Sequence, residues 1–240
     1  MTEVRTEASP STEASPEASA TFDRRTRLTI SAILAGTVIL LLGFGAGWLA
    51  RPQPASAALP TTTSAEAGFA RDMQVHHQQA VEMSVLLRDR SENEEVRTLA
   101  LDILTGQGQQ AGQMYGWLAM WGLPQAPAEP RMTWMMRPPL AGAGNHEHGS
   151  SDGAMADHVP GEPMPGLASP EDIARLTAAS GSAADRLYLE LMIEHHRGGV
   201  TMADAVLDRS ANRTVTDLAS SMTAAQQAEI DYMTDLLGRV

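Results

Sequence analysis

The sequence predicts an all-α protein: a four-helix bundle made of two repeated helical hairpins, preceded by one transmembrane helix. First, a His-His pair flanked by methionines occurs twice, at an offset of 119 residues. Second, each copy is followed by a segment whose apolar residues recur every three or four positions, as in an amphipathic helix. Third, a long apolar run near the N-terminus carries no charge. Two repeats are too few for an open solenoid, so one closed, pseudo-symmetric domain is expected.

The N-terminal segment predicts a membrane anchor. Residues 1–27 are rich in Ser, Thr, Glu and Pro and are expected to form a disordered cytoplasmic tail. Residues 28–50 lack charges and are long enough to span a bilayer. Three arginines precede this run and one follows it, so the positive-inside rule places the N-terminus in the cytoplasm. The expected product is a single-pass cell-membrane protein with an extracytoplasmic C-terminal domain.

A cleaved signal peptide is the alternative for this segment. The small residues Ala55, Ser56 and Ala57 could form a cleavage site, and cleavage there would release a secreted domain. The apolar run is longer than the usual signal-peptide core of about 7–15 residues, which favours an uncleaved anchor. Residues 51–64 are then a linker, and residues 65–240 form the bundle.

The first hairpin is expected to begin near Ala65. Its first helix has one narrow apolar seam, formed by Phe69, Met73, His76, Ala80, Met83 and Leu87. Ser91, with Glu94 three residues later, predicts a capping box for the second helix, which should end at Gly122. The glycines of that second helix suggest close approach of a neighbouring helix; they are Gly106, Gly108, Gly112 and Gly116.

Residues 123–168 form an insert rich in Pro, Gly and His, and a short helix is expected at about 170–179. Ser169 is a suitable N-cap, with proline and acidic residues directly after it. The insert contains possible metal ligands at His146, His148, Met155, His158 and Met164. A flexible collector of metal ions and a solvated linker both fit this segment. The second hairpin then repeats the first, with seams starting at Tyr188 and Val215.

Composition excludes several function classes. The chain has no cysteine, so disulfides, thiolate metal sites and cysteine nucleophiles are excluded. Its formal net charge is -12, which favours cations and does not suit nucleic acid. The 14 methionines provide both flexible core side chains and soft metal ligands.

The polar residues on the seams are the candidates for chemistry. His76 and His195 lie among apolar residues, and Gln110 and Glu229 lie on the seams of the partner helices. The second histidine of each pair is rotated by about 100° and could flank the seam, reach a neighbouring helix or meet solvent. Structural packing and metal binding both fit this pattern. Among metals, Met and His without Cys suit copper best, because thioether is a soft ligand and imidazole accepts both oxidation states.

Two motifs resemble a known family. Met73-x-x-His-His-x-x-Ala-x-x-Met83 and Met192-Ile-x-His-His-x-Gly-x-x-x-Met202 are each followed by a second-helix motif that ends at Met114 or Met233. This combination is similar to the bacterial domain-of-unknown-function family numbered three hundred and five, which includes a periplasmic copper-binding protein. The resemblance implies a ferritin-like helical fold and copper bound by Met73, His76, His77, Met83, Met114, Met192, His195, His196, Met202, Met233 and Glu229. The copies differ at Gln110 against Glu229, and at Asp72 against Leu191.

The sequence therefore predicts a membrane-anchored, extracytoplasmic protein that binds copper for buffering, trafficking or tolerance and is not an enzyme. Its expected partners are metal ions and, through residues 28–50, the membrane; nucleic acid is not expected, and homo-oligomerisation stays open. An acidic helical interaction module, with the His and Met seams serving packing only, is the alternative. A redox enzyme that uses bound copper is a third interpretation. It requires an open coordination position on the metal, which the sequence cannot show.

Overall fold

The computed structural model describes residues 36–37, 39–45, 47, 59–141 and 159–240. Residues Ala57–Val240 form one compact unit. Its elements are α2 (Ala65–Arg88), α3 (Glu94–Met120), the 3₁₀ turn η1 (Thr133–Met136), α4 (Pro170–Ala178), α5 (Gly181–Leu207) and α6 (Arg213–Leu237). The described chain contains helices and no strand, which confirms the all-α prediction.

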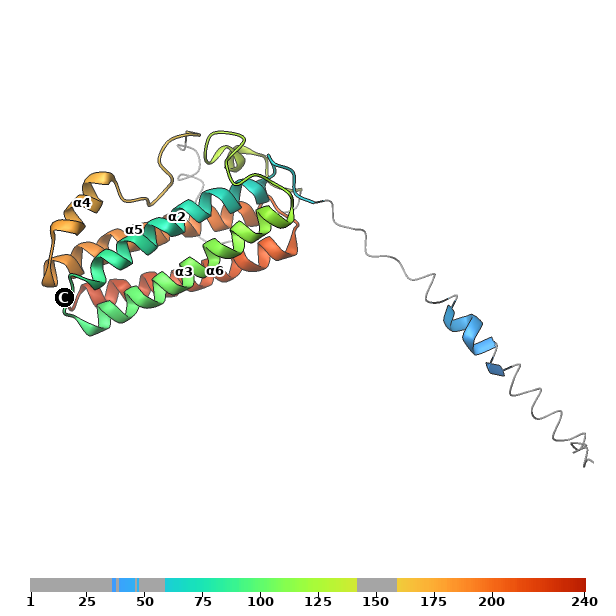
Figure 1. The fold of residues 1–240 in the computed structure, drawn as a ribbon, viewed down its shortest axis with the longest axis horizontal. Coiled ribbons are helices and arrows are strands. Elements are labelled where there is room, and N and C mark those ends of the chain that lie inside the picture. Colours follow the sequence, from blue (N-terminus) through green and yellow to red (C-terminus); the bar gives the residue numbers. More distant parts are fainter. Residues whose placement is uncertain (1–35, 38, 46, 48–58, 142–158) are drawn as a thin grey trace, which may run out of the picture. The chain divides into compact units, whose positions relative to one another are not determined.

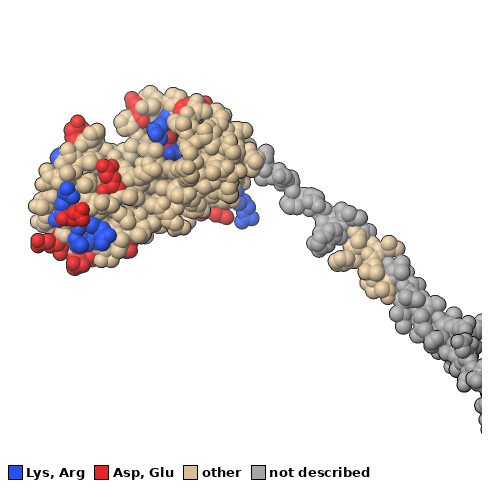
Figure 2. All heavy atoms as spheres, in the orientation of Figure 1, with Lys and Arg blue, Asp and Glu red and all other residues tan. Residues whose placement is uncertain are grey.

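The long helices form two hairpins that pack through their first members. α2 packs along α3, α5 packs along α6, and α2 contacts α5 across the centre (Figure 1). The backbones of α3 and α6 approach each other less closely, although Tyr232 of α6 donates a hydrogen bond to Glu95 of α3. The apolar core divides into two clusters that both draw on α2, α3, α5 and α6. On the face shown in Figure 2, charged side chains of both signs gather at the left end of the bundle, where α2 turns into α3 and α6 ends.

Asparagine side chains start the second helix of each hairpin. Asn93 accepts hydrogen bonds from the backbone of Glu95 and Val96, and Asn212 accepts one from Thr214. The expected Ser91 capping box is therefore wrong, because Asn93 is the residue that reaches the first free amides, and Glu94 is already in the first turn. For α4 the prediction is confirmed: Ser169 and Asp172 form a reciprocal capping box with Pro170 at the first helical position.

The glycines of α3 do not bring another helix close. A Cβ atom at Gly106, Gly112 or Gly116 would meet nothing within 4 Å, and one at Gly108 would touch only the Val81 side chain at 3.8 Å. These glycines face solvent or a cavity, so the predicted close approach is wrong.

Several predicted segments fall outside the described residues. These are the tail 1–27, most of the expected membrane span 28–50, most of the linker 51–64, and residues 142–158 with His146, His148, Met155 and His158. None of the described helices combines the length and the apolar character that a membrane crossing requires.

Candidate metal centre

The two seam histidines meet where α2 contacts α5. His76 and His195 are both fully buried, at 0% exposure. Their ring centroids lie 3.8 Å apart, and the ring planes differ by 35°. The repeat-related positions therefore come together near the pseudo-twofold centre of the bundle, between the two apolar clusters.

Hydrogen bonds define which nitrogen of each ring carries the proton. His76 Nε2 lies 3.1 Å from the Pro165 carbonyl oxygen, and His195 Nε2 lies 2.8 Å from the carbonyl oxygen of His76. A carbonyl can only accept, so each Nε2 is the donor, and Nδ1 of the neutral ring keeps its lone pair. Neither Nδ1 atom has a hydrogen-bond partner. Two buried imidazole lone pairs are thus available to a ligand.

Burial keeps these rings neutral at physiological pH. Desolvation, with a smaller effect of the neighbouring imidazoles, lowers the pKa of His76 and of His77 to about 3. The same causes lower the pKa of His195 well below its ordinary value. Neutral imidazole is the form that binds metal ions, so protons compete weakly for these nitrogens near neutral pH.

The flanking histidines reach the partner helix of their own hairpin, and both are fully buried. His77 Nε2 donates to Gln110 Oε1 at 2.8 Å. In the second copy, His196 Nδ1 donates to the Met192 carbonyl at 2.9 Å, and Nε2 lies 2.7 Å from Glu229 Oε2. Both nitrogens of His196 therefore face oxygen atoms. The two halves differ here in the group that contacts the flanking histidine, an amide in the first copy and a carboxylate in the second.

The candidate methionines sort into two triples on either side of the histidines. Met73, Met114 and Met202 lie in one apolar cluster. Met83, Met192 and Met233 lie in the other. The offset of 119 residues maps each triple onto the other, and all six side chains are fully buried. Among the residues that the structure describes, no three His, Asp or Glu side chains converge to hold a metal ion.

The end of the insert covers the histidines from the α2–α5 side. Gln79 holds this loop through two hydrogen bonds with Ala168, to its carbonyl at 2.9 Å and from its amide at 2.8 Å. On α5, a Cβ at Gly198 would lie only 2.0 Å from the Pro165 carbonyl oxygen, so glycine is required for the loop to approach. Sequence reasoning missed this role, although two adjacent glycines inside a helix are an unfavourable choice that could have indicated it.

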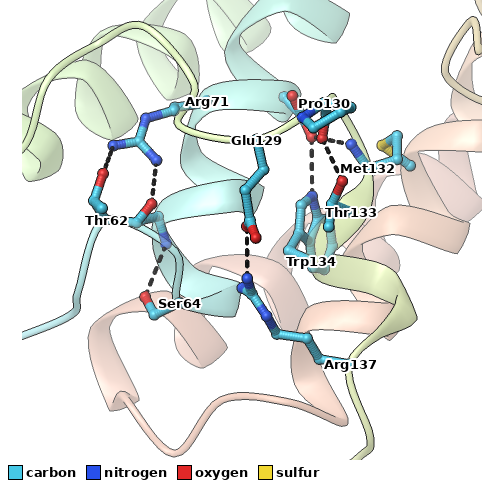
Figure 3. Close-up of polar contacts among 11 residues, drawn as sticks. Thr62, Ser64, Arg71, Glu129, Pro130, Met132, Thr133, Trp134 and Arg137 are labelled. Carbon is cyan, nitrogen blue, oxygen red and sulfur yellow. Dashed lines mark hydrogen bonds and ion pairs between the residues drawn. The ribbon is translucent and has the colours of Figure 1, made fainter. Parts of the chain in front are cut away.

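A buried carboxylate anchors the first part of the insert. Asp72 accepts hydrogen bonds from the Met132 amide at 2.8 Å and from Trp134 Nε1 at 3.0 Å; both donor residues are labelled in Figure 3. Arg131 lies 3.3 Å from the Asp72 carboxylate. Desolvation raises the pKa of Asp72, and these three donors oppose that rise. The second copy has Leu191 at the equivalent position. The difference between the copies therefore marks where the insert attaches to α2.

Comparisons with known proteins agree with the repeat motifs. The sequence profile of the family Domain of unknown function (DUF305) matches residues 66–237. A DUF305 protein from Streptomyces coelicolor, inferred to be secreted, shares 43% identity with a TM-score of 0.63, covering 75% of this chain and 95% of the other. A DUF305 fragment from Deinococcus radiodurans shares 32% identity with a TM-score of 0.56, covering 75% and 100% of the two chains.

A more distant structure has the same fold. CopM in its Cu(I)-bound form shares 22% identity with a TM-score of 0.50, covering 75% of this chain and 97% of CopM. A search of curated proteins gave no significant match. The profile match spans most of the chain, and the Streptomyces protein is closely similar over nearly its whole length. The resemblance found in the sequence is thereby confirmed: the chain belongs to the DUF305 family.

Proposed function

We propose that this protein binds copper ions outside the cytoplasm, for buffering, trafficking or tolerance, and is not an enzyme. One observation carries the proposal: His76 and His195 meet with unpaired Nδ1 atoms between two triples of buried methionines. Thioether suits Cu(I), and imidazole accepts Cu(I) and Cu(II). Full burial of these side chains suits holding an ion more than processing a substrate.

The comparisons support the same function. CopM, which shares the fold, has been solved in Cu(I)-, Cu(II)- and Ag-bound forms. The Streptomyces relative is inferred to be secreted, which supports an extracytoplasmic location for this chain. Anchoring through residues 28–50 belongs to the proposal as well, on the apolar run in the sequence.

The close, tilted arrangement of the two rings implies a local rearrangement on binding. An imidazole lone pair lies in the plane of its ring, and the planes of His76 and His195 differ by only 35°. One ion shared by both Nδ1 atoms therefore requires at least one ring to rotate. The methionines on either side are flexible enough to follow that rotation.

Metal titration tests the proposal. The purified protein is titrated with Cu(I) and Ag(I) against a competing chelator, alongside the double variant His76→Gln/His195→Gln. We expect the parent protein to bind the ion with a Kd below micromolar. The double variant should bind at least about tenfold more weakly, because the affinity of a metal site depends strongly on each of its ligands and their partners. Met120→Leu is the matched control, since Met120 is 71% exposed. Unchanged affinity in the double variant contradicts the proposal.

An acidic helical interaction module is the competing function. It is favoured by the complete burial of the six methionines within apolar clusters, where they also serve as ordinary core residues. A ligand that binds only the folded state raises the melting temperature with its concentration. A melting temperature that is indifferent to copper and silver supports the interaction module instead.

A further inference from the structure

The histidines are closed off on the α2–α5 side of the bundle. The loop at Pro165 accepts the hydrogen bond from His76, and Gln79 fixes Ala168 beside it. η1 and α4 each contact both α2 and α5. An ion arriving from this side would have to displace packed backbone.

The opposite side, between α3 and α6, contains a cavity of about 40 Å³. It is lined by Asp102, Gln107 and Gln110 from α3 and by Gln226 and Glu229 from α6. Asp102 and Glu229 also line a shallow groove that runs to the surface beside Glu94 and Tyr232. The volume is sufficient for one or two water molecules or a partly hydrated ion.

Unpaired polar atoms line this cavity. Gln107 and Gln226 are only 5% and 4% exposed. Neither amide atom of Gln107 has a hydrogen-bond partner, and the same holds for Gln226 Oε1. Buried polar groups normally find a partner, so three unpaired atoms around one cavity indicate something that binds there. Carboxylate and amide oxygens together are suitable ligands for a cation.

The cavity lies one hydrogen bond from the buried histidines. Glu229 contacts His196 at 2.7 Å, and Gln110 contacts His77 at 2.8 Å. A cation held by Glu229 is therefore next to an imidazole nitrogen as soon as the Glu229–His196 hydrogen bond opens. His196 also orients the Glu229 carboxylate, as outer partners of metal-binding carboxylates do.

We propose that the α3–α6 cavity is the port through which a metal cation reaches the buried histidines. Asp102 and Glu229 attract the cation from solvent, the amide oxygens of Gln107 and Gln226 replace part of its water, and Glu229 passes it to His196. This inference rests on the proposed function, because it assumes that the interior binds a metal ion. It adds the route, and it assigns Glu229 to capture and transfer.

The rate of silver uptake tests the port. Ag(I) is mixed with the full-length protein in chloride-free buffer, and tryptophan fluorescence is followed by stopped flow. We expect the double variant Asp102→Asn/Glu229→Gln to take up Ag(I) about three- to tenfold more slowly, because two steering charges are lost. Glu190→Gln removes an exposed carboxylate of α5 that does not line the cavity, and its uptake rate should match the parent.

A second pair of variants separates access from charge. Gly106 lines the cavity and has open space beside it, so Gly106→Leu should fill the port and slow uptake, whereas Gly112→Leu on the same helix should not. Unchanged uptake rates in both Gly106→Leu and the double charge variant overturn the port while leaving the proposed function standing. Absence of tight Ag(I) binding by the parent protein overturns both.

Discussion

Asp72 is the residue that fixes the first part of the insert to the bundle. It is buried at 2% exposure and accepts from the Met132 amide and the Trp134 indole. Asp72→Leu, which copies the residue of the second repeat, leaves both donors buried without an acceptor. We expect a loss of about 2–5 kcal/mol in the free energy of unfolding, since each unpaired group costs about 1–3 kcal/mol.

Urea unfolding followed by tryptophan fluorescence measures this loss, because Trp134 is itself at the site and packs edge-on against Phe69. Asp72→Asn keeps one acceptor oxygen and should lose less. Asp217→Leu is the control, an exposed position where changes usually stay within about 0.5 kcal/mol. Equal effects of Asp72→Leu and Asp217→Leu would show that the anchor does not stabilise the fold.

Single residues differed in how far the sequence could predict them. Helical periodicity separated the seam residues His76 and His195 from their neighbours, and the structure buries both where the hairpins meet. The same periodicity left the direction of His77 and His196 open, because their partners Gln110 and Glu229 come from another helix. The assignment of these residues as copper ligands stays a prediction.

At the scale of the helices, the insert packs closely on α5 at one glycine. Gly198 allows the Pro165 carbonyl to lie where a side chain would otherwise be, with a Cβ at only 2.0 Å. We expect Gly198→Ala to lower the free energy of unfolding by about 1–3 kcal/mol through overpacking. This loss should outweigh the gain of up to about 1 kcal/mol that alanine brings to a helix.

Gly112→Ala is the matched control for this variant. Its Cβ meets nothing within 4 Å, so only the helix-propensity gain of about 0.5–1 kcal/mol should remain. Urea unfolding of the two variants should therefore give opposite signs. A stabilising effect of Gly198→Ala would mean that the loop at Pro165 does not pack tightly on α5.

Elements were predictable where local signals decided them. The repeats gave the two hairpins, and Ser169 with Pro170 gave the start of α4. The start of α3 was misplaced because serine and asparagine are both good caps and only geometry selects Asn93. The contacts of the insert were not predictable, since Gln79 and Ala168 are 89 residues apart and carry no local pattern.

Three of the pairs of positions at which the pseudo-twofold symmetry breaks distinguish the two faces of the bundle. Asp72 against Leu191 and Gln79 against Gly198 are differences at which the insert attaches to the α2–α5 face. At the third pair, the second copy has the carboxylate of Glu229 where the first copy has the amide of Gln110, and both residues line the cavity between α3 and α6. The symmetric repeats therefore form the interior, and the asymmetric positions make one face closed and the other accessible and acidic.

The buried histidines should also make the stability of the whole domain depend on pH. Above the unfolded-state pKa of about 6.5, the rings are neutral in both states, and pH has no effect through them. Below that value the unfolded chain binds protons, while His76 and His77, with a pKa of about 3, and His195, with its pKa also lowered, do not. The free energy of unfolding should therefore fall as pH drops from 6.5 towards 3, by up to about 1.4 kcal/mol per pH unit for each ring.

Carboxylates with shifted pKa values modify this pH dependence of the free energy of unfolding without reversing it. The raised pKa of Asp72 has the opposite sign, because the folded state then takes up its proton first. The lowered pKa values of Glu95 and Asp172 act in the same direction as the histidines. Glu95 is exposed and Asp172 is only partly buried, so both should contribute little. Because three rings act against one carboxylate, acidification should lower the free energy of unfolding overall. A domain of ordinary stability should therefore unfold well above pH 3.

Urea midpoints measured between pH 7.5 and about 4.5, with a chelator present, test this dependence over the range where the rings separate the two states. In the double variant His76→Gln/His195→Gln, only His77 of the three low-pKa rings remains, so the midpoint should vary less with pH, even if it is lower at pH 7.5. A flat profile for the parent protein down to about pH 5 would mean that water or protons reach these rings in the folded state, and that the histidine layer is more open than its complete burial indicates.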